Sequence, residues 1–270
     1  MALLKADDIG VRLYERGQAP VALVDGVSFQ LEQGQSMGLV GESGSGKSLL
    51  CRALLGVLPP AMTACGKAEF AGASLLDMPE QALEKVRGAG IAMIPQDAAT
   101  AFAPSFTLGT QLAGTLRMHT RCTAKQAREA IVNALSNLHM PDAAHVLTRY
   151  PHQLSGGMLQ RCMIALTLLL RPRVIIADEP TTALDVLARK EAVDALMVAR
   201  ESTKAALVLV SHDLALVGAL ADQILVLHQG RAVEYGPTKN MLDNPRHEHT
   251  RYLLGSCHSA KYRYGAAVHA

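Results

Sequence analysis

The residues most able to do chemistry in this chain form one glycine-rich octapeptide. Its members are Gly41, Glu42, Ser43, Gly44, Ser45, Gly46, Lys47 and Ser48. Glycines allow a loop to wrap around phosphate groups with its N–H groups pointing inward, and the N-terminus of a following helix adds partial positive charge. Lys47 can then reach the β- and γ-phosphates of a nucleotide, while the Ser48 hydroxyl can ligate Mg²⁺. Because an apolar run precedes the loop and a helix-prone run follows it, the motif predicts a nucleotide phosphate site and not a plain surface loop.

A second candidate element carries two carboxylates at the end of an apolar run. Asp178 and Glu179 directly follow residues 174–177, a run typical of a strand buried on both faces of a parallel sheet. Ligands bind at the carboxyl edge of such sheets, where Asp178 could hold Mg²⁺ and Glu179 could polarise an attacking water. Two acids after a strand are also common in solvated loops, so this pair alone is weak evidence for a nucleotide site. Together with the loop around Lys47 it becomes strong evidence.

A third element lies at the start of a long apolar helix. Ser155 can cap this helix, and Gly156 and Gly157 leave bare N–H groups that could bind an anion. One chain rarely needs two such helix termini for one nucleotide, so we expect this one to serve a nucleotide held by another subunit. Taken alone, the same residues would also suit an ordinary capped helix with flexible glycines.

The order of these elements resembles that of the ATP-binding subunits of ABC transporters. The resemblance rests on residues 41–48, Gln96, residues 154–157, Asp178, Glu179, residues 183–185 and His212. It implies ATP hydrolysis with Mg²⁺, in which Gln96 senses Mg²⁺, water and the membrane subunits. It also implies that Asp185 crosses the seam of an ATPase dimer and that His212 contacts the γ-phosphate.

Three positions depart from the pattern of that family. Met158 replaces the usual Gln after the two glycines, which is tolerable because backbone N–H groups do the binding. Leu49 removes a hydroxyl that is common after the Lys-Ser pair. The aromatic residue that stacks on adenine is expected near Leu13, but the nearest is Tyr14, and adjacent strand residues face opposite sides. Either a bulge turns Tyr14 inward or the stacking on adenine is weak, and Tyr14 is the candidate for this contact.

Finer features resemble the peptide and nickel importer branch of the family. They lie in residues 41–49, 156–161, 176–182 and 244–254. Peptide-transporting members continue into a cysteine-bearing extension, so a chain that stops at Ala270 is more similar to the nickel or metal-chelate ATPases. The His-x-His pattern at His247 and His249 belongs to the same tail motif. Because two histidines supply only half of a tetrahedral zinc site, we do not expect a metal site from this pair.

Composition excludes several other classes of protein. The net charge is +2, aromatic residues make up 4% and Trp is absent, which argues against nucleic acid as a partner. No apolar run approaches the roughly 20 residues that span a bilayer, and the N-terminus lacks the pattern of a signal peptide. The five cysteines show no C-x-x-C spacing and are expected to be free thiols. We therefore expect the chain to lie in the cytoplasm, and the resemblance to ABC transporter subunits implies a peripheral position on the inner membrane.

Hydrophobic periodicity changes along the chain and predicts an α/β fold with an all-helical insert. Thr123 is a predicted N-cap. Strands are expected at residues 11–14, 22–24, 27–31, 91–94, 174–177, 207–210, 224–227 and 232–234, and helices at 124–138, 186–200 and 214–220.

The resemblance implies a P-loop NTPase (RecA-like) core with an N-terminal antiparallel β subdomain and an inserted α-helical subdomain. Residues 1–270 would be one ATP-binding domain, with its core at 1–104 and 166–245, its helical subdomain at 105–165 and a tail at 246–270. Such a chain would dimerise with a homologous ATPase beneath two transmembrane permease subunits fed by a solute-binding protein, and would power import of nickel, a metal chelate or a peptide. A soluble ABC-type ATPase of DNA repair or translation is the alternative, but the chain has no room for a long coiled-coil insert or a second cassette. A non-enzymatic scaffold is the other alternative, and it would be expected to lack Glu179 or His212.

Overall fold

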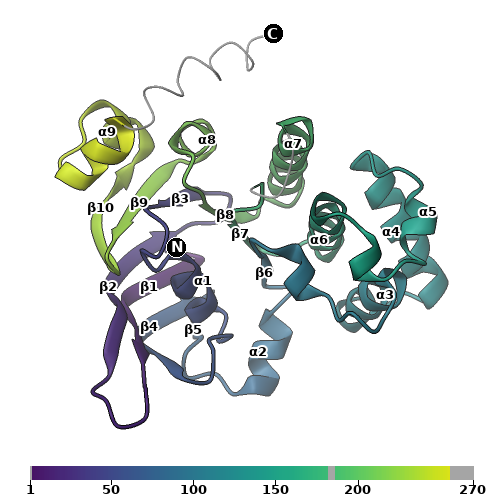
Figure 1. Cartoon of the computed structure of the whole chain (residues 1–270), viewed down its shortest axis with the longest axis horizontal. Helices are drawn as coiled ribbons and strands as arrows, with labels where there is room; N and C mark the ends of the chain where they lie inside the picture. Colours follow the sequence, from purple (N-terminus) through teal and green to yellow (C-terminus); the bar gives the residue numbers. More distant parts are fainter. Residues whose placement is uncertain (1, 182–185, 256–270) are drawn as a thin grey trace. The chain divides into compact units, whose positions relative to one another are not determined.

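The computed structural model describes residues 2–181 and 186–255 of the chain (Figure 1). The backbone divides into two compact units, which are described in turn. The first unit combines Met1–Leu83 with Ala206–Ala270, and the second is Glu84–Ala205. The subdomain boundaries inferred from the sequence stay a prediction.

An antiparallel sheet in the first unit has the strand order β2-β1-β4-β5. Leu4 at the start of β1 pairs with Leu31 of β2 and with Phe70 of β4. Two short strands expected at residues 22–24 and 27–31 are one continuous strand, and the sequence did not indicate β4. The strands are β1 (Leu4–Leu13), β2 (Val21–Leu31), β4 (Met62–Phe70) and β5 (Ala73–Ser74).

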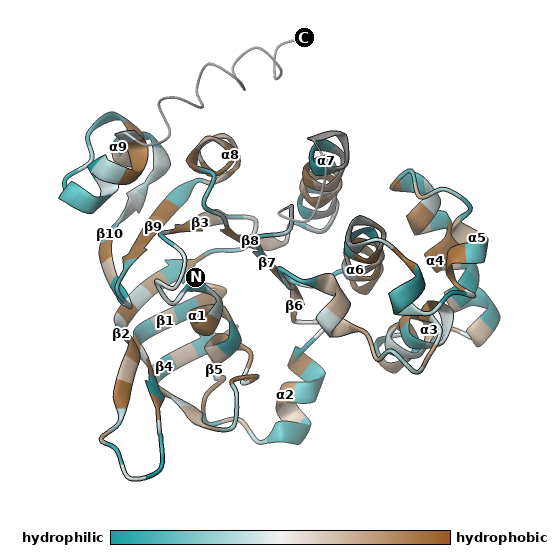
Figure 2. Ribbon diagram, viewed as in Figure 1, coloured by the Kyte–Doolittle hydropathy of each residue, from teal (hydrophilic) through white to brown (hydrophobic). Residues whose placement is uncertain are grey.

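A second group of strands in the first unit has the order β10-β9-β3-β8. Strand β3 pairs in parallel with both β8 and β9, while β9 and β10 form the predicted antiparallel hairpin. Every residue of β3 and β8 is buried. Residues 224–227 of β9 are buried too, and much of its ribbon carries the hydrophobic colour (Figure 2). The strands are β3 (Ser36–Val40), β8 (Ala206–Val210), β9 (Gln223–His228) and β10 (Arg231–Pro237). The helices are α1 (Lys47–Leu54), α8 (Leu214–Leu220) and α9 (Thr238–Asp243).

In the second unit, β6 (Ile91–Ile94) and β7 (Val174–Asp178) run parallel, with Ile91 opposite Val174 and Ile94 opposite Ala177. Both strands were predicted from their apolar runs. Helix α2 (Glu80–Val86) crosses the boundary between the units in sequence, and α7 (Val186–Thr203) follows β7. Helix α7 ends at Thr203, three residues beyond the predicted end at residue 200.

The remaining helices of the second unit confirm the helical periodicity of residues 105–165. They are α3 (Leu108–His119), α4 (Ala124–Asn137), α5 (Ala143–Val146) and α6 (Gly156–Leu170), with short 3₁₀ turns η1 (Ala98–Ala101) and η2 (Pro151–Gln153). Helix α4 packs against α3 and α6 through its buried residues Ala127, Ile131 and Leu135.

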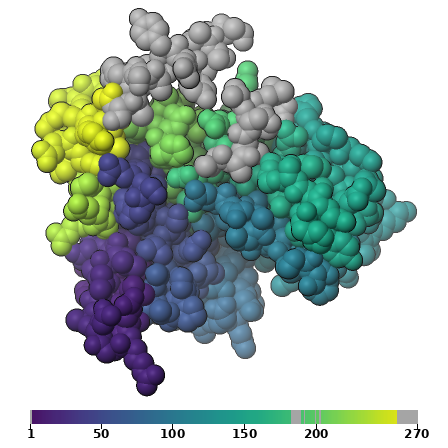
Figure 3. All heavy atoms as spheres, viewed as in Figure 1, coloured from purple at the N-terminus to yellow at the C-terminus, as the bar shows by residue number. Residues whose placement is uncertain are grey.

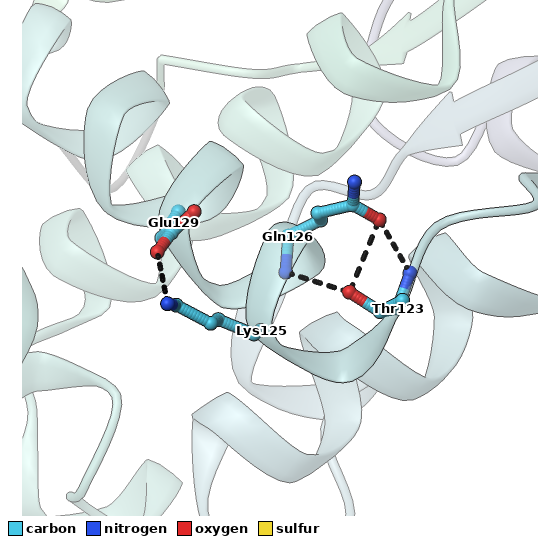
Figure 4. A network of polar contacts seen from close by, with 4 residues as sticks. All are labelled: Thr123, Lys125, Gln126 and Glu129. Carbon is cyan, nitrogen blue, oxygen red and sulfur yellow. Dashed lines mark hydrogen bonds and ion pairs between the residues drawn. The ribbon is translucent and has the colours of Figure 1, made fainter.

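The start of α4 shows how a local sequence sets a helix boundary (Figure 4). The Thr123 hydroxyl accepts the N–H of Gln126 at 3.3 Å, and the Gln126 side-chain oxygen accepts the N–H of Thr123 at 2.9 Å. This capping box satisfies two backbone donors that a helix terminus otherwise leaves unpaired. The predicted N-cap is confirmed. Among the residues that the model covers, no helix has both the length and the apolar character needed to cross a membrane.

Candidate nucleotide-binding site

The octapeptide is a loop between a buried strand and a helix, as its flanks predicted. Strand β3 ends at Val40, and α1 begins at Lys47. Gly46 adopts a left-handed conformation (φ 100°) at the N-cap of α1. A Cβ at Gly41 would lie 2.2 Å from the carbonyl oxygen of Leu227 on β9, so the backbone passes too close for any side chain. The sharp turn and the close approach therefore both require glycine.

Lys47 holds the shape of this loop from its own first helical position. Lys47 is 6% exposed, and its ammonium donates to the carbonyl oxygens of Gly41 at 2.9 Å and Glu42 at 2.8 Å. A phosphate oxygen is a charged acceptor and binds an ammonium more strongly than a neutral carbonyl does. The same ammonium can therefore exchange a loop carbonyl for a phosphate oxygen. Ser45 is buried, while Ser48, just after the lysine, is partly exposed.

His212 and the phosphate loop line the same pocket within the first unit. This pocket has a volume of about 250 Å³, and its lining includes Gly41, Glu42, His212 and, from the C-terminal segment, Tyr252 and Leu253. His212 is exposed and follows β8 by two residues. The residue after it, Asp213, accepts the N–H groups of Ala215 and Leu216 at 3.0 and 3.1 Å. This cap fixes the turn that presents the imidazole.

The acidic pair lies in the second unit at the carboxyl end of β7. Asp178 is 2% exposed, and Glu179 is partly exposed with a left-handed backbone (φ 46°). Such a conformation costs energy for a residue with a side chain and is enriched at functional sites. The Gln96 amide, two residues after β6, donates to a carboxylate oxygen of Glu179 at 3.1 Å. The structure therefore brings Gln96 and Glu179 together, although 83 residues separate them in the sequence.

The third element forms the predicted cap of α6. The Ser155 hydroxyl accepts the N–H of Met158 at 3.3 Å. Gly156 is exposed and Gly157 is partly exposed, so the first turn of a 15-residue helix is open to solvent in this chain. Tyr14 is 51% exposed, and its N–H donates to Ala61. Asp185 lies outside the residues that the structure describes.

A feature that the sequence did not indicate is the position of the C-terminal segment. Residues 248–255 are helical, and the yellow C-terminal atoms adjoin the dark blue segment that contains the phosphate loop (Figure 3). The Glu234 carboxylate on β10 accepts the N–H groups of Arg246 at 2.9 Å and His247 at 3.0 Å. Burial acts to raise the pKa of Glu234, but the nearby Thr250 side chain and these two N–H groups outweigh it and lower the pKa. No local periodicity could have revealed this contact, because Glu234 and the segment lie on different elements.

Strand, glycine loop and helix, with an acidic pair after a second parallel strand, define a P-loop nucleotide-binding α/β protein. Two solved structures confirm the fold class. A dimeric ATP-binding cassette in a post-hydrolysis state with ADP and phosphate superposes with a TM-score of 0.76 at 24% identity, covering 87% of this chain and 98% of that one. The protein cbiO1 from Clostridium perfringens, part of the ABC transporter complex cbiONQ, superposes with a TM-score of 0.71 at 22% identity, covering 98% of this chain and 96% of that one.

Sequence comparison then identifies the family. The family model described as "ABC transporter" matches residues 24–182. The chain is 39% identical over 234 residues to the metal-staphylopine import system ATP-binding protein CntD of Staphylococcus aureus, covering 87% of this chain and 86% of the relative. It is 40% identical over 255 residues to the dipeptide transport ATP-binding protein DppD of Escherichia coli, covering 94% and 78%. The chain therefore belongs to the ABC transporter family and is one of its ATPases, as the sequence motifs predicted.

Proposed function

We propose that this chain is the ATPase subunit that energises import of a metal chelate or a peptide across the inner membrane. The observation that carries the proposal is its 39–40% identity, over most of both chains, to ATP-binding proteins of metal-staphylopine import and dipeptide transport. Solute selectivity resides in other subunits of such a system, so the choice between metal chelate and peptide stays open on this chain alone.

The phosphate loop would bind ATP. Lys47 would contact the β- and γ-phosphates, and Tyr14 is the candidate for stacking on adenine. Ser48, Gln96 and Asp178 would hold Mg²⁺ through hydroxyl, amide and carboxylate oxygens, the hard ligands that this ion prefers. When bound, Mg²⁺ would neutralise charge on the β- and γ-phosphates. Ser48 belongs to the first unit, and Gln96 and Asp178 belong to the second. Membership of the ABC transporter family supports the proposal that all three act on one nucleotide.

Glu179 would act as the base that positions the attacking water. Its hydrogen bond from Gln96, at 3.1 Å, orients the carboxylate that would accept a proton from water. His212 would donate to the γ-phosphate, where charge accumulates during transfer. The same contact between Gln96 and Glu179 offers a route by which a membrane subunit acting on Gln96 could alter hydrolysis.

The active form would be a dimer of this chain with a homologous ATPase. Ser155 and the N–H groups of Gly156 and Gly157 would face the ATP bound by the partner subunit, and Asp185 would lie at the seam. Two transmembrane permease subunits, served by a solute-binding protein, would hold this dimer at the cytoplasmic face of the membrane. ATP would then close the dimer and hydrolysis would reopen it.

The test is a Glu179→Gln variant assembled with its permease partners. It should retain ATP binding and lose about 100-fold or more in turnover, the scale of removing a general base. Glu129→Gln, an exposed carboxylate on α4, is the matched control and should turn over ATP at the unaltered rate. A Glu179→Gln assembly with unchanged turnover would refute the catalytic role. If the isolated unaltered chain does not associate with permeases and hydrolyses ATP as fast as the preparation that contains them, the result would instead favour an ATPase not coupled to transport.

A further inference from the structure

Three side chains with metal-binding chemistry meet beside the phosphate loop, within the first unit. They are Glu42 from the loop itself, His228 at the end of β9 and His249 on the C-terminal helical segment. One oxygen of Glu42 and one ring nitrogen of each histidine all lie within 4.8 Å of one another. The two imidazole rings are close, with their centroids 3.8 Å apart. Three distant parts of the sequence thus converge on one point.

Within this cluster, one buried ring nitrogen of His249 makes no hydrogen bond to the described residues. The side chain is 9% exposed, and its Nε2 atom is buried without a hydrogen bond to any residue that the structure describes. Leaving a buried polar atom unpaired costs about 1–3 kcal/mol, so native proteins rarely tolerate it unless an ion or a water occupies the site. A bound cation would satisfy the buried imidazole nitrogen and the neighbouring carboxylate and imidazole together, because their ligand atoms lie within 4.8 Å of one another.

The kind of cation follows from the ligand atoms. Two imidazole nitrogens with one glutamate oxygen form the His₂Glu set that binds zinc with an open fourth position. Imidazole suits zinc, copper, nickel and iron, whereas magnesium and calcium prefer oxygen ligands throughout. We propose that Glu42, His228 and His249 bind one divalent transition-metal ion and leave a coordination position for water or another ligand.

His247, the other histidine of the His-x-His pattern, makes a hydrogen bond to the backbone and is not one of the proposed metal ligands. Its Nδ1 atom accepts the N–H of His249 at 3.1 Å, which orders the backbone just before the helical segment. The proposed site therefore takes His249 alone from this pattern, and the expectation about the pair of His247 and His249 remains a prediction. The ligands that join His249 are instead Glu42 and His228, which no spacing pattern connects.

A metal at this point would link the C-terminal segment to the phosphate loop and to β9. Binding to the native state alone stabilises that state by mass action, so the amides of residues 246–255 should exchange more slowly when metal is present. The proposal is independent of the ATPase proposal, because metal binding can be measured without nucleotide.

The experiment uses the full chain without an affinity tag, stripped of metal with a chelator and free of nucleotide. Calorimetric titration with Zn²⁺ should show one equivalent bound, and an excess of Mg²⁺ should not displace it. Co²⁺ should give visible d–d bands without a thiolate charge-transfer band, which separates this site from the cysteines. Absence of stoichiometric binding, or a thiolate spectrum, would overturn the proposal.

Two variants locate the site. Glu42→Gln and His228→Gln should each weaken Zn²⁺ binding by at least about 10-fold, because loss of a mere outer-shell partner already costs roughly 10- to 100-fold. Both positions are at least partly exposed, so the fold should survive, and circular dichroism would verify this. Glu15→Gln and His145→Gln remove exposed groups outside the cluster and should bind Zn²⁺ unchanged. Unaltered affinity in both cluster variants would refute the assignment.

Discussion

Replacing Glu234 by Gln should release the C-terminal helical segment from the first unit. In the structure this carboxylate accepts the N–H groups of Arg246 and His247, immediately before the helical residues 248–255. An amide of nearly the same shape keeps one oxygen acceptor but loses the other and the negative charge. The substitution therefore tests the charge and the second hydrogen bond while leaving the packing of the side chain largely unchanged.

The expected effect is a loss of about 2 kcal/mol in the free energy of opening the segment. Hydrogen bonds to a charged group contribute about 1.5–3 kcal/mol each, against about 1 kcal/mol for a neutral pair. We take the lower end because Glu234 is partly exposed and solvent screens the charge. A loss of about 2 kcal/mol corresponds to roughly a 30-fold increase in the open population.

Hydrogen–deuterium exchange of the amides in residues 246–255 measures this population directly. Exchange there should accelerate by about 30-fold in Glu234→Gln, whereas the amides of β3 and β8 should not change. Glu248→Gln is the matched control, since Glu248 is exposed on the same segment and carries the same charge. Equal exchange in Glu234→Gln and the unaltered chain would refute the reasoning, and an equal effect of the control would show that only overall charge matters.

The same contact has a predictable pH dependence. The pKa of Glu234 is lower in the folded chain than its ordinary value of 4.5, so the carboxylate stabilises the closed segment above about pH 4.5. This stabilisation is lost as the pH falls through the lowered folded-state pKa. After correction for intrinsic exchange rates, protection of residues 246–255 should fall in this acid range in the unaltered chain and show a weaker dependence in Glu234→Gln.

Three further predictions address the loop, the dimer and a buried thiol. Gly41→Ala should destabilise the chain by about 1–3 kcal/mol and abolish ATP binding, because its Cβ would lie 2.2 Å from the Leu227 carbonyl; an unchanged urea midpoint would contradict this. Gly157→Asp should leave ATP affinity of the isolated chain intact but suppress ATP-driven association in sedimentation, and loss of ATP binding by the monomer would refute action across the dimer. Burial raises the pKa of Cys162 to about 12, so alkylation at pH 8 followed by peptide mapping should label exposed Cys65 and spare Cys162; equal labelling of both would be the contrary result.

Much of the nucleotide-binding half of the site could be predicted because its chemistry is local in sequence. The phosphate loop needs glycines, a lysine and a hydroxyl at fixed offsets between a strand and a helix, and all of these lie within residues 41–48. The capping of α4 by Thr123 and Gln126 is local for the same reason. Apolar runs also predicted β6, β7 and β8, because strands buried on both faces carry little besides aliphatic residues.

Other elements had no such signal. Strand β4 contains Gly66 and several exposed residues, so its pattern did not stand out, and its pairing with β1 and β5 makes it a strand. The amide of Gln96 meets Glu179 across 83 residues, and the motifs named both residues without showing that they touch.

The sequence alone therefore determined the class of protein and the glycine-rich loop between strand and helix, since both depend on contiguous residues and on the periodicity of single elements. Tertiary structure alone decided what lies beside that loop. Glu42, His228 and His249 converge, and Glu234 holds residues 246 and 247, because the hairpin and the C-terminal segment return to the phosphate loop. The periodicity of a helix or a strand cannot predict these contacts, since they depend on how separate elements pack.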